Sequence, residues 1–148
     1  RLHEQHPEED VQPVGVPTIA CFRMTRRLEG ASTLTAKHVH RWCADAVGLT
    51  GDWRTAGPVY AIPWGALRGV RNHNLLAAGR CISADASVWD VTRVIPPCAV
   101  TGEAAGTGAA MAMKACSGDL VRLPVTELQS QLIAQGALID PGLVEEML

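Results

Sequence analysis

One stretch limits the possible folds of this chain more than any other, because it is long, nearly uncharged and entered through two prolines. Between residues 98 and 115 the charged side chains are Glu103 and Lys114. Pro96 and Pro97 stand just before it and suit the first turn of a helix, where a missing N–H group costs little. A helix that is apolar on all sides is typical of a protein interior. We therefore predict a buried helix over this stretch.

Three glycines inside the predicted helix require an explanation. Gly102, Gly106 and Gly108 each cost about 1 kcal/mol relative to alanine in a helix interior. Close approach of another backbone or of a ligand is the usual compensation. The stretch is apolar enough to raise the question of a membrane span, but the prolines, Glu103 and the glycines interrupt it. The spacing of Gly102 and Gly106 favours tight packing inside a core, and we expect no membrane partner.

A short apolar segment precedes the long helix and predicts a buried strand. Leu75–Ala78 is apolar on both faces, as expected of a strand that is covered on both sides. Gly79 ends the predicted strand, and an irregular segment then leads to the helix. Residues 70–118 therefore predict a strand, a long loop and a helix in that order.

The first half of the chain predicts shorter elements. Residues 1–17 hold three prolines and four acidic residues and predict an extended lead-in. Thr18–Met24 and Arg26–Leu34 contain strand-like stretches with Ile, Phe, Thr and Leu. Thr35 is suited to cap an amphipathic helix that ends at Gly48. The apolar stripe of that helix is predicted to consist of Val39, Trp42, Cys43 and Ala46.

The remaining segments alternate between loops, one strand and short helices. Residues 51–58 predict a loop, Tyr60–Ile62 a brief strand ended by Pro63, and residues 64–70 a turn or short helix. A further helix is predicted to start at Thr126, and a short helical tail closes the chain. That helix is expected to use Gln129 in a capping box, Leu128, Leu132 and Ile133 as its apolar stripe, and Gly136 as its stop. The mixture predicts an α/β or α+β fold.

Composition excludes some partners and suggests a compartment. The chain has 148 residues and a formal net charge of −2, so there is no electrostatic case for nucleic acid or a membrane surface. Its five cysteines follow no metal-binding spacing and are expected to be buried free thiols in a reducing cytoplasm. A redox role for Cys98, near a helix N-terminus, is the alternative. No Met precedes Met24, so we expect a fragment or a processed product.

Three motifs in a fixed order resemble the C-terminal flavin-binding segment of FAD-dependent oxidoreductases. They are GRCIS at 79–83, RVIPPC at 93–98 and GEAAG at 102–106. The resemblance is to the bacterial family related to the fumarate-reductase and glutathione-reductase flavoproteins. It extends over residues 18–135, since RRLEG at 26–30 and YAIP at 60–63 are similar to earlier segments of that family.

The resemblance implies a division of the chain and a set of cofactor contacts. Residues 18–69 would belong to a substrate domain, residues 70–118 to the end of a Rossmann-like FAD-binding domain, and residues 119–148 to a helical tail. Amides near Cys98–Thr101, at the start of the long helix, would face the flavin and stabilise negative charge that develops on it. The cofactor-binding residues would be Gly79, Arg80, Ser83, Arg93, Pro97, Cys98, Ala99, Thr101 and Gly102.

The arginines admit two interpretations each. Arg80 stands where many related flavoproteins carry an acidic residue, and its guanidinium group suits phosphate instead. Arg23 and Arg27 would share one face of a strand and contact an anionic substrate, or they would lie on a solvated edge strand. Arg93 would face the flavin or the substrate, or it would form an ion pair with Asp85 or Asp90. The catalytic residues cannot be assigned from the sequence, and no metal site is expected.

One expected component of a flavoprotein is missing from the sequence. A G-x-G-x-x-G motif between a strand and a helix, which would hold the ADP half of FAD, does not occur. The first hypothesis is therefore the C-terminal part of an FAD-dependent oxidoreductase, which needs an N-terminal half and a small-molecule substrate. The alternative is a non-enzymatic packing or self-association module without bound FAD, for which a homo-oligomer is possible.

Overall fold

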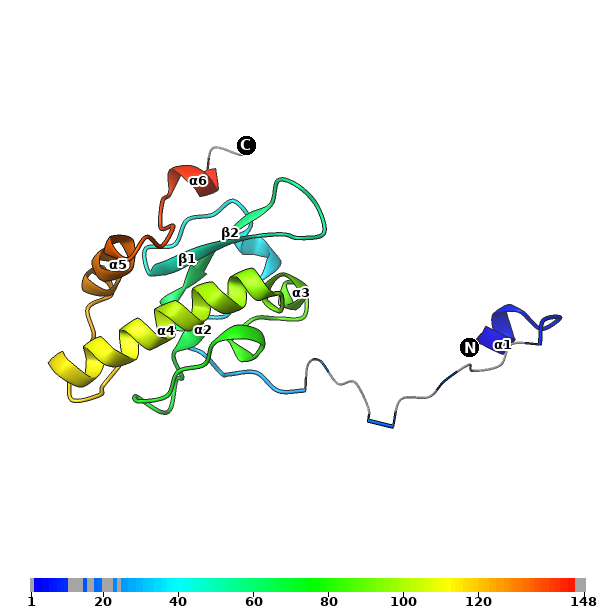
Figure 1. Ribbon diagram of the computed structural model, residues 1–148, viewed down its shortest axis with the longest axis horizontal. Helices are drawn as coiled ribbons and strands as arrows, with labels where there is room; N and C mark the ends of the chain where they lie inside the picture. Colours follow the sequence, from blue (N-terminus) through cyan, green and yellow to red (C-terminus); the bar gives the residue numbers. More distant parts are fainter. Residues whose placement is uncertain (1, 11–14, 16–17, 20–22, 24, 146–148) are drawn as a thin grey trace.

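The computed structural model describes residues 2–10, 15, 18–19, 23 and 25–145, and it combines helices with a small sheet (Figure 1). This confirms the predicted mixed fold class. The elements are α1 (Leu2–Gln5), the 3₁₀ turn η1 (Ala36–His38), β1 (Ala46–Gly51), β2 (Val59–Pro63), α2 (Trp64–Leu67), the 3₁₀ turn η2 (Gly79–Cys81), α3 (Trp89–Thr92), α4 (Ile95–Ala115), α5 (Val125–Ala134) and α6 (Gly142–Glu145).

The sheet is a two-stranded antiparallel hairpin, β1 and β2, joined by the predicted loop. Tyr60 lies opposite Thr50 on β1, and Val39 forms an isolated bridge to the same tyrosine. The predicted strand Tyr60–Ile62 is confirmed, and it extends to Val59 and Pro63. Both strands contribute buried side chains to the core because helices cover the sheet.

The long helix α4 is confirmed, with prolines in its first turn, and it lies across the sheet (Figure 1). Its buried residues are Pro97, Thr101, Ala104, Gly108 and Ala112, which we call the inner face. The prediction that this helix is buried on all sides was wrong, because Ile95 is 85% exposed and Met113 is 68% exposed. In the part of the chain that the structure describes, no helix has the length and hydropathy needed to cross a bilayer.

The predicted helix after Thr35 was wrong beyond its first turn. Thr35 does act as the N-cap, and His38 completes a capping box with it, but the turn ends there. Val39 then pairs with Tyr60, and Ala46 begins β1. The helical spacing of the apolar residues after Thr35 therefore did not indicate a helix, because this segment contacts the core in an extended conformation.

The predicted strands outside the hairpin are reduced to isolated bridges. Leu76 bridges Arg68, so Leu75–Ala78 forms no strand within the described residues. Gly30 bridges Gly69 and Leu34 bridges Ala84, while residues 20–22 and 24 of the first predicted strand lie outside the described residues. A ladder needs a neighbouring strand with free backbone groups, and this chain offers these segments too few.

The C-terminal part follows the prediction with one change of role. Helix α5 starts at Val125 without a side-chain cap, so the predicted capping box was wrong. Gln129 instead donates hydrogen bonds, each 2.9 Å long, to the carbonyls of Ala44 and Ala46 and fastens α5 to β1. Leu128 and Leu132 are buried as expected, whereas Ile133 of the predicted stripe is 53% exposed. The predicted stop at Gly136 is confirmed by its φ of +96°.

Candidate functional site

The turn η2 is locked onto the first turns of α4 through Thr101. The Gly79 amide donates to the Thr101 hydroxyl at 2.8 Å, and that hydroxyl donates to the Pro97 carbonyl at 2.7 Å. Gly79 has a φ of +70°, which disfavours any side chain, and a Cβ there would lie 3.2 Å from the sulfur of Cys98. Four of the predicted cofactor-binding residues therefore hold this junction together.

Ser83 also has a structural partner inside the protein. Its side chain is buried, and its hydroxyl lies 2.9 Å from the Thr33 hydroxyl. Its amide donates to the Ala66 carbonyl at 2.8 Å, and its carbonyl accepts from the Leu34 amide at 2.9 Å. These bonds join η2 to the segment before η1 and to α2. Thr33 was missed in the sequence, because no spacing pattern links it to Ser83.

The start of α4 offers fewer free amides than its length suggests. The Cys98 amide donates to the Val94 carbonyl at 3.2 Å, and Thr101 lies on the inner face of the helix interior. The prediction of free amides over Cys98–Thr101 was therefore wrong. The helix begins at Ile95, so carbonyls one turn earlier accept hydrogen bonds from these amides. Two of the first positions are prolines and have no amide to offer.

An open surface nevertheless runs along this end of α4. Ala99 and Gly102 are exposed, and a Cβ on Gly102 would meet nothing within 4 Å. Arg80 is exposed on η2, which packs against α4. The partial positive charge of the helix terminus remains at this end. The residues present therefore fit one wall of a flavin site, with a cation beside it, rather than an enclosed cavity.

Arg93 is fixed between two aromatic rings in front of α4. Its guanidinium carbon lies 5.5 Å from the ring centroid of Trp53 and 5.4 Å from that of Trp89. Its Nε donates to an Asp90 carboxylate oxygen at 2.6 Å, and the side chain is 22% exposed. The ion pair that we considered as the alternative for Arg93 is thus present with Asp90. The two tryptophans were missed, since nothing in their spacing indicates that they meet.

The same cluster fastens the β1–β2 loop to α3. The Trp53 indole nitrogen donates to the Asp90 carbonyl at 2.8 Å, and Arg54 lies 3.6 Å from the Asp90 carboxylate. Arg54 also pairs with Asp52 at 2.7 Å. Hydrogen bonding to Arg54 lowers the pKa of the Asp52 carboxyl. The loop therefore has a defined position next to the start of α4.

Of the other two substrate candidates, Arg23 and Arg27 are both exposed. Arg27 comes directly before Leu28, whose amide donates to the Cys81 carbonyl at 2.8 Å. The backbone at Arg27 is thus brought beside η2. Arg23 has neighbours outside the described residues. The shared strand face predicted for these two side chains stays a prediction.

The described cysteines form no disulfide among themselves. Cys43, Cys81, Cys98 and Cys116 are free, but the predicted burial was wrong for Cys81, which is exposed. Burial, with a smaller contribution from Asp45, raises the pKa of Cys43 to about 12 and keeps that thiol protonated and inert at neutral pH. The Cys98 sulfur lies 3.8 Å from the Thr92 carbonyl. Among the described residues no three His, Cys, Asp or Glu side chains gather as a metal site requires.

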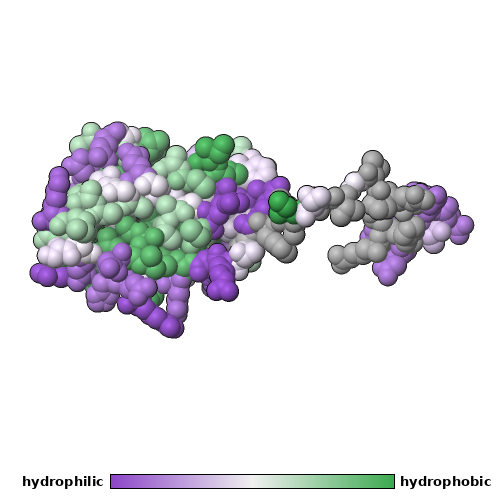
Figure 2. All heavy atoms as spheres, turned by 60° about the horizontal axis from the view of Figure 1, so that its bottom comes forward, coloured by the Kyte–Doolittle hydropathy of each residue, from purple (hydrophilic) through white to green (hydrophobic). Residues whose placement is uncertain are grey.

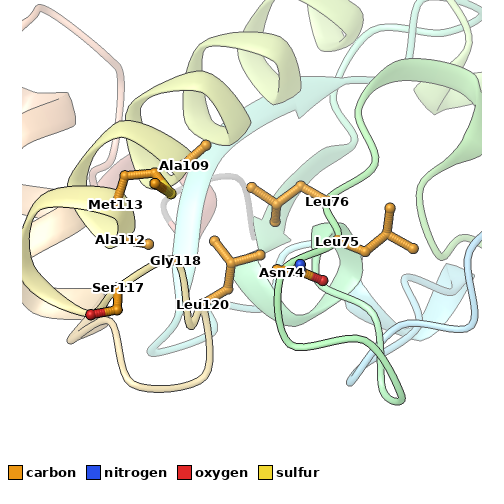
Figure 3. Close-up of a pocket in the computed structure, with 9 residues that line it drawn as sticks. All are labelled: Asn74, Leu75, Leu76, Ala109, Ala112, Met113, Ser117, Gly118 and Leu120. Carbon is orange, nitrogen blue, oxygen red and sulfur yellow. The ribbon is translucent and has the colours of Figure 1, made fainter.

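A pocket of about 480 Å³ lies farther along α4, between the helix and the segment that precedes η2. Leu76 and Leu120 extend toward Ala109 and Met113 of α4 across this hollow (Figure 3). The remaining lining residues are Asn74, Leu75, Ala112, Ser117 and Gly118. The lining carries no charged side chain, so the pocket suits an apolar occupant.

Comparisons with known proteins agree with the motifs at η2 and α4. No curated protein and no solved structure matches the chain. A family model described as FAD dependent oxidoreductase matches residues 4–132, which include the hairpin, η2, α4 and most of α5. The chain therefore belongs to the FAD-dependent oxidoreductase family.

Proposed function

We propose that this chain completes the flavin site of an FAD-dependent oxidoreductase and that an N-terminal half supplies the rest of that site. The observation that carries the proposal is the open end of α4 beside η2, in a chain of this family. When bound, FAD supplies hydride or electron transfer with a small-molecule substrate. The G-x-G-x-x-G unit that would hold its ADP half does not occur here.

The predicted cofactor-binding residues divide into two groups in this proposal. Arg80, Ala99 and Gly102 are exposed and would contact the cofactor, with Arg80 directed to phosphate. Gly79, Ser83, Pro97 and Thr101 are buried and would hold η2 and α4 in register. The Cys98 side chain would pack against Gly79. Arg93 would position the start of α4 through its aromatic neighbours.

The division of the chain stays part of the proposal. Residues 18–69 are assigned to a substrate domain, and residues 70–118 to the end of a Rossmann-like FAD-binding domain of bacterial type. Residues 1–17 are assigned to a lead-in and residues 119–148 to a helical tail. Arg23 and Arg27 would face the substrate. We place the protein in the cytoplasm because its described cysteines are free. The family match gives no support to a non-enzymatic packing module.

Absorption tests the proposal directly. The protein should be expressed together with the polypeptide encoded upstream in the same reading frame and reconstituted with FAD. We expect a yellow protein with flavin absorption bands, whereas the chain alone stays colourless. A colourless preparation that contains both parts would reject the flavin function.

A matched pair of arginine variants sharpens this test. Arg80→Ala is expected to weaken FAD binding by about 1.5–3 kcal/mol, which is the usual value of a hydrogen bond to a charged group. Arg122→Ala, at an exposed position far along the chain from η2, should leave the affinity unchanged. The affinity of each variant is measured by titrating FAD into the protein that contains both parts. Equal affinities would remove Arg80 from the proposed contacts.

A further inference from the structure

Basic side chains next to η1 share a hollow of the surface. The hollow has a volume of about 420 Å³ and is lined by Lys37, Val39, His40 and Arg41, which we call the basic pocket. Lys37 and Arg41 are exposed. Within the described residues, neither of these two side chains forms an ion pair. Positive charge gathered at a concave site without a counter-charge favours an anion.

Exposed charge by itself is ordinary on this molecule, because hydrophilic side chains border the hydrophobic area that Figure 2 shows. The basic pocket differs in that three basic side chains and no acidic one line the same hollow. Arg54, by contrast, lies 2.7 Å from the Asp52 carboxylate. Asp45 accepts a hydrogen bond from the Gly65 amide at 3.0 Å, and neither it nor Glu145 lines the basic pocket. The charge of this pocket is therefore left for a ligand.

His40 is held in the basic pocket by contacts with two other elements. Its φ of +52° lies in a region that most residues other than glycine avoid. Its amide donates to the Val59 carbonyl of β2 at 2.9 Å. Its ring Nδ1 lies 3.2 Å from the Val144 carbonyl of α6, and because a carbonyl only accepts, Nδ1 carries the proton. Nε2 is thereby left for the pocket. Backbone strain of this kind gathers at sites that hold ligands.

The basic pocket is fixed to the sheet at its backbone. Val39 bridges Tyr60, so the residues after η1 lie alongside β2 (Figure 1). On the other side, Thr35 caps η1, and the Ala36 amide donates to the Ser87 hydroxyl at 3.1 Å. The backbone that carries the three basic side chains is therefore already in place. A ligand would not have to order this segment in order to bind, which favours affinity.

We infer that the basic pocket binds the phosphate group of a small molecule. Lys37 and Arg41 would donate charge-assisted hydrogen bonds to the phosphate oxygens. A phosphate monoester releases its second proton at a pH of about 6, so near neutral pH it occurs with and without that proton. It therefore suits Nε2 of His40 both as a donor and as an acceptor. Sulfate and carboxylate groups carry no proton at neutral pH and lack this match. The inference does not depend on the proposed flavin function.

Titration of the chain with inorganic phosphate tests the inference. The ionic strength is held constant, because salt screens exposed charges. Binding is measured by calorimetry and by the nuclear magnetic resonance signals of the His40 ring. Arg41→Gln removes one charge of the basic pocket, and Arg122→Gln makes the same change at an exposed position that does not line it. Both variants are first compared with the unaltered chain by circular dichroism.

We expect the unaltered chain to bind phosphate with a change in the His40 signals. Arg41→Gln should weaken the binding by about tenfold or more, which is the usual effect of losing a hydrogen bond to a charged group. Arg122→Gln should stay within about twofold of the unaltered chain. Equal affinities of the two variants, or no binding of phosphate by the unaltered chain, would overturn the inference.

Two further probes identify the anion. Sulfate and acetate should each bind at least about tenfold more weakly than phosphate to the unaltered chain. His40→Asn keeps a residue type that tolerates a positive φ but removes Nε2, so it should abolish the preference for phosphate over sulfate. Equal binding of phosphate and either other anion by the unaltered chain would reject the phosphate assignment. Displacement of phosphate by the polypeptide encoded upstream would show that the pocket is an interface between the two parts, which also overturns the inference.

Discussion

The inner face of α4 and its exposed side, which holds Gly102, Gly106 and Ala109 and which we call the open flank, both carry small residues. Contacts within this chain explain the glycine of the inner face only. On the inner face, Gly108 lets the Trp64 ring approach, and Thr101 bonds the Gly79 amide. On the open flank, Gly106 faces empty space. The presence of a small residue in a helix is therefore explained only by the group that packs against it. Substitutions on the two sides should therefore have opposite effects on stability.

The largest effect is expected for Thr101→Val on the inner face. Valine keeps the shape of threonine but leaves the buried Gly79 amide without an acceptor, which costs about 2–3 kcal/mol. Thr101→Ser retains the hydroxyl and should lose much less. Urea unfolding of the three proteins measures the free energy of unfolding. Equal stability of the valine and serine variants would show that the junction does not depend on this hydroxyl.

Gly108→Ala should destabilise the chain by a smaller amount. The added Cβ would lie 2.5 Å from the ring of Trp64, which is only 2% exposed and has no room to move. Overpacking costs about 1–3 kcal/mol, and better helix propensity returns about 1 kcal/mol. We expect a net loss of up to about 2 kcal/mol in the same urea assay. A gain in stability would contradict the close packing of this face.

Arg93→Lys extends the test to the residues in front of α4. Lysine keeps the charge but cannot stack its plane between Trp53 and Trp89 or keep the Asp90 geometry. We expect a loss of about 1 kcal/mol and a weaker near-ultraviolet circular dichroism signal from the tryptophans. An unchanged spectrum would mean that the stack does not order the β1–β2 loop.

Gly106→Ala should have the opposite sign. Its Cβ meets nothing within 4 Å, so the isolated chain should gain up to about 1 kcal/mol from helix propensity. Thermal unfolding of the two proteins measures this gain. A loss of stability in the isolated chain would remove the contrast between the two sides of α4.

The smallest effect concerns the ion pair of Asp52 and Arg54 in the β1–β2 loop. Arg54 lowers the pKa of Asp52 in the folded state. The pair therefore contributes stability above the unfolded pKa of about 3.9, and this contribution is lost as pH falls through the lower folded value. Solvent screening keeps the contribution small. Asp52→Asn should flatten the acid side of the pH–stability curve slightly, and an unchanged curve would show that the pair contributes nothing.

Local signals predicted those elements whose cause lies within a few residues. The proline pair starts α4, Gly136 stops α5, and Thr35 caps its turn, because each effect acts on the neighbouring backbone. The helix expected after Thr35 failed where long-range pairing acted instead. Val39 forms a bridge to Tyr60, so an apolar spacing that suits a helix occurs here in extended backbone.

The sequence predicted which segments form the candidate site, but it did not predict the contacts that their residues make. The order of the motifs around η2 and α4 led to the family that the comparison confirms. It could not indicate that Thr101 would bond Gly79, or that Arg93 would lie between two tryptophans. These contacts join residues distant in the chain, and only the packed structure brings them together.

By itself, the sequence determined the family, the mixed fold class and the position of the long helix, since these depend on motif order and local backbone preference. The tertiary structure alone decided which glycine supports Trp64 and which faces solvent. It also decided that the amides of Leu76 and Ala78 stay open among the described residues. The physical reason is that burial and hydrogen bonding depend on partners far along the chain, which no local pattern identifies.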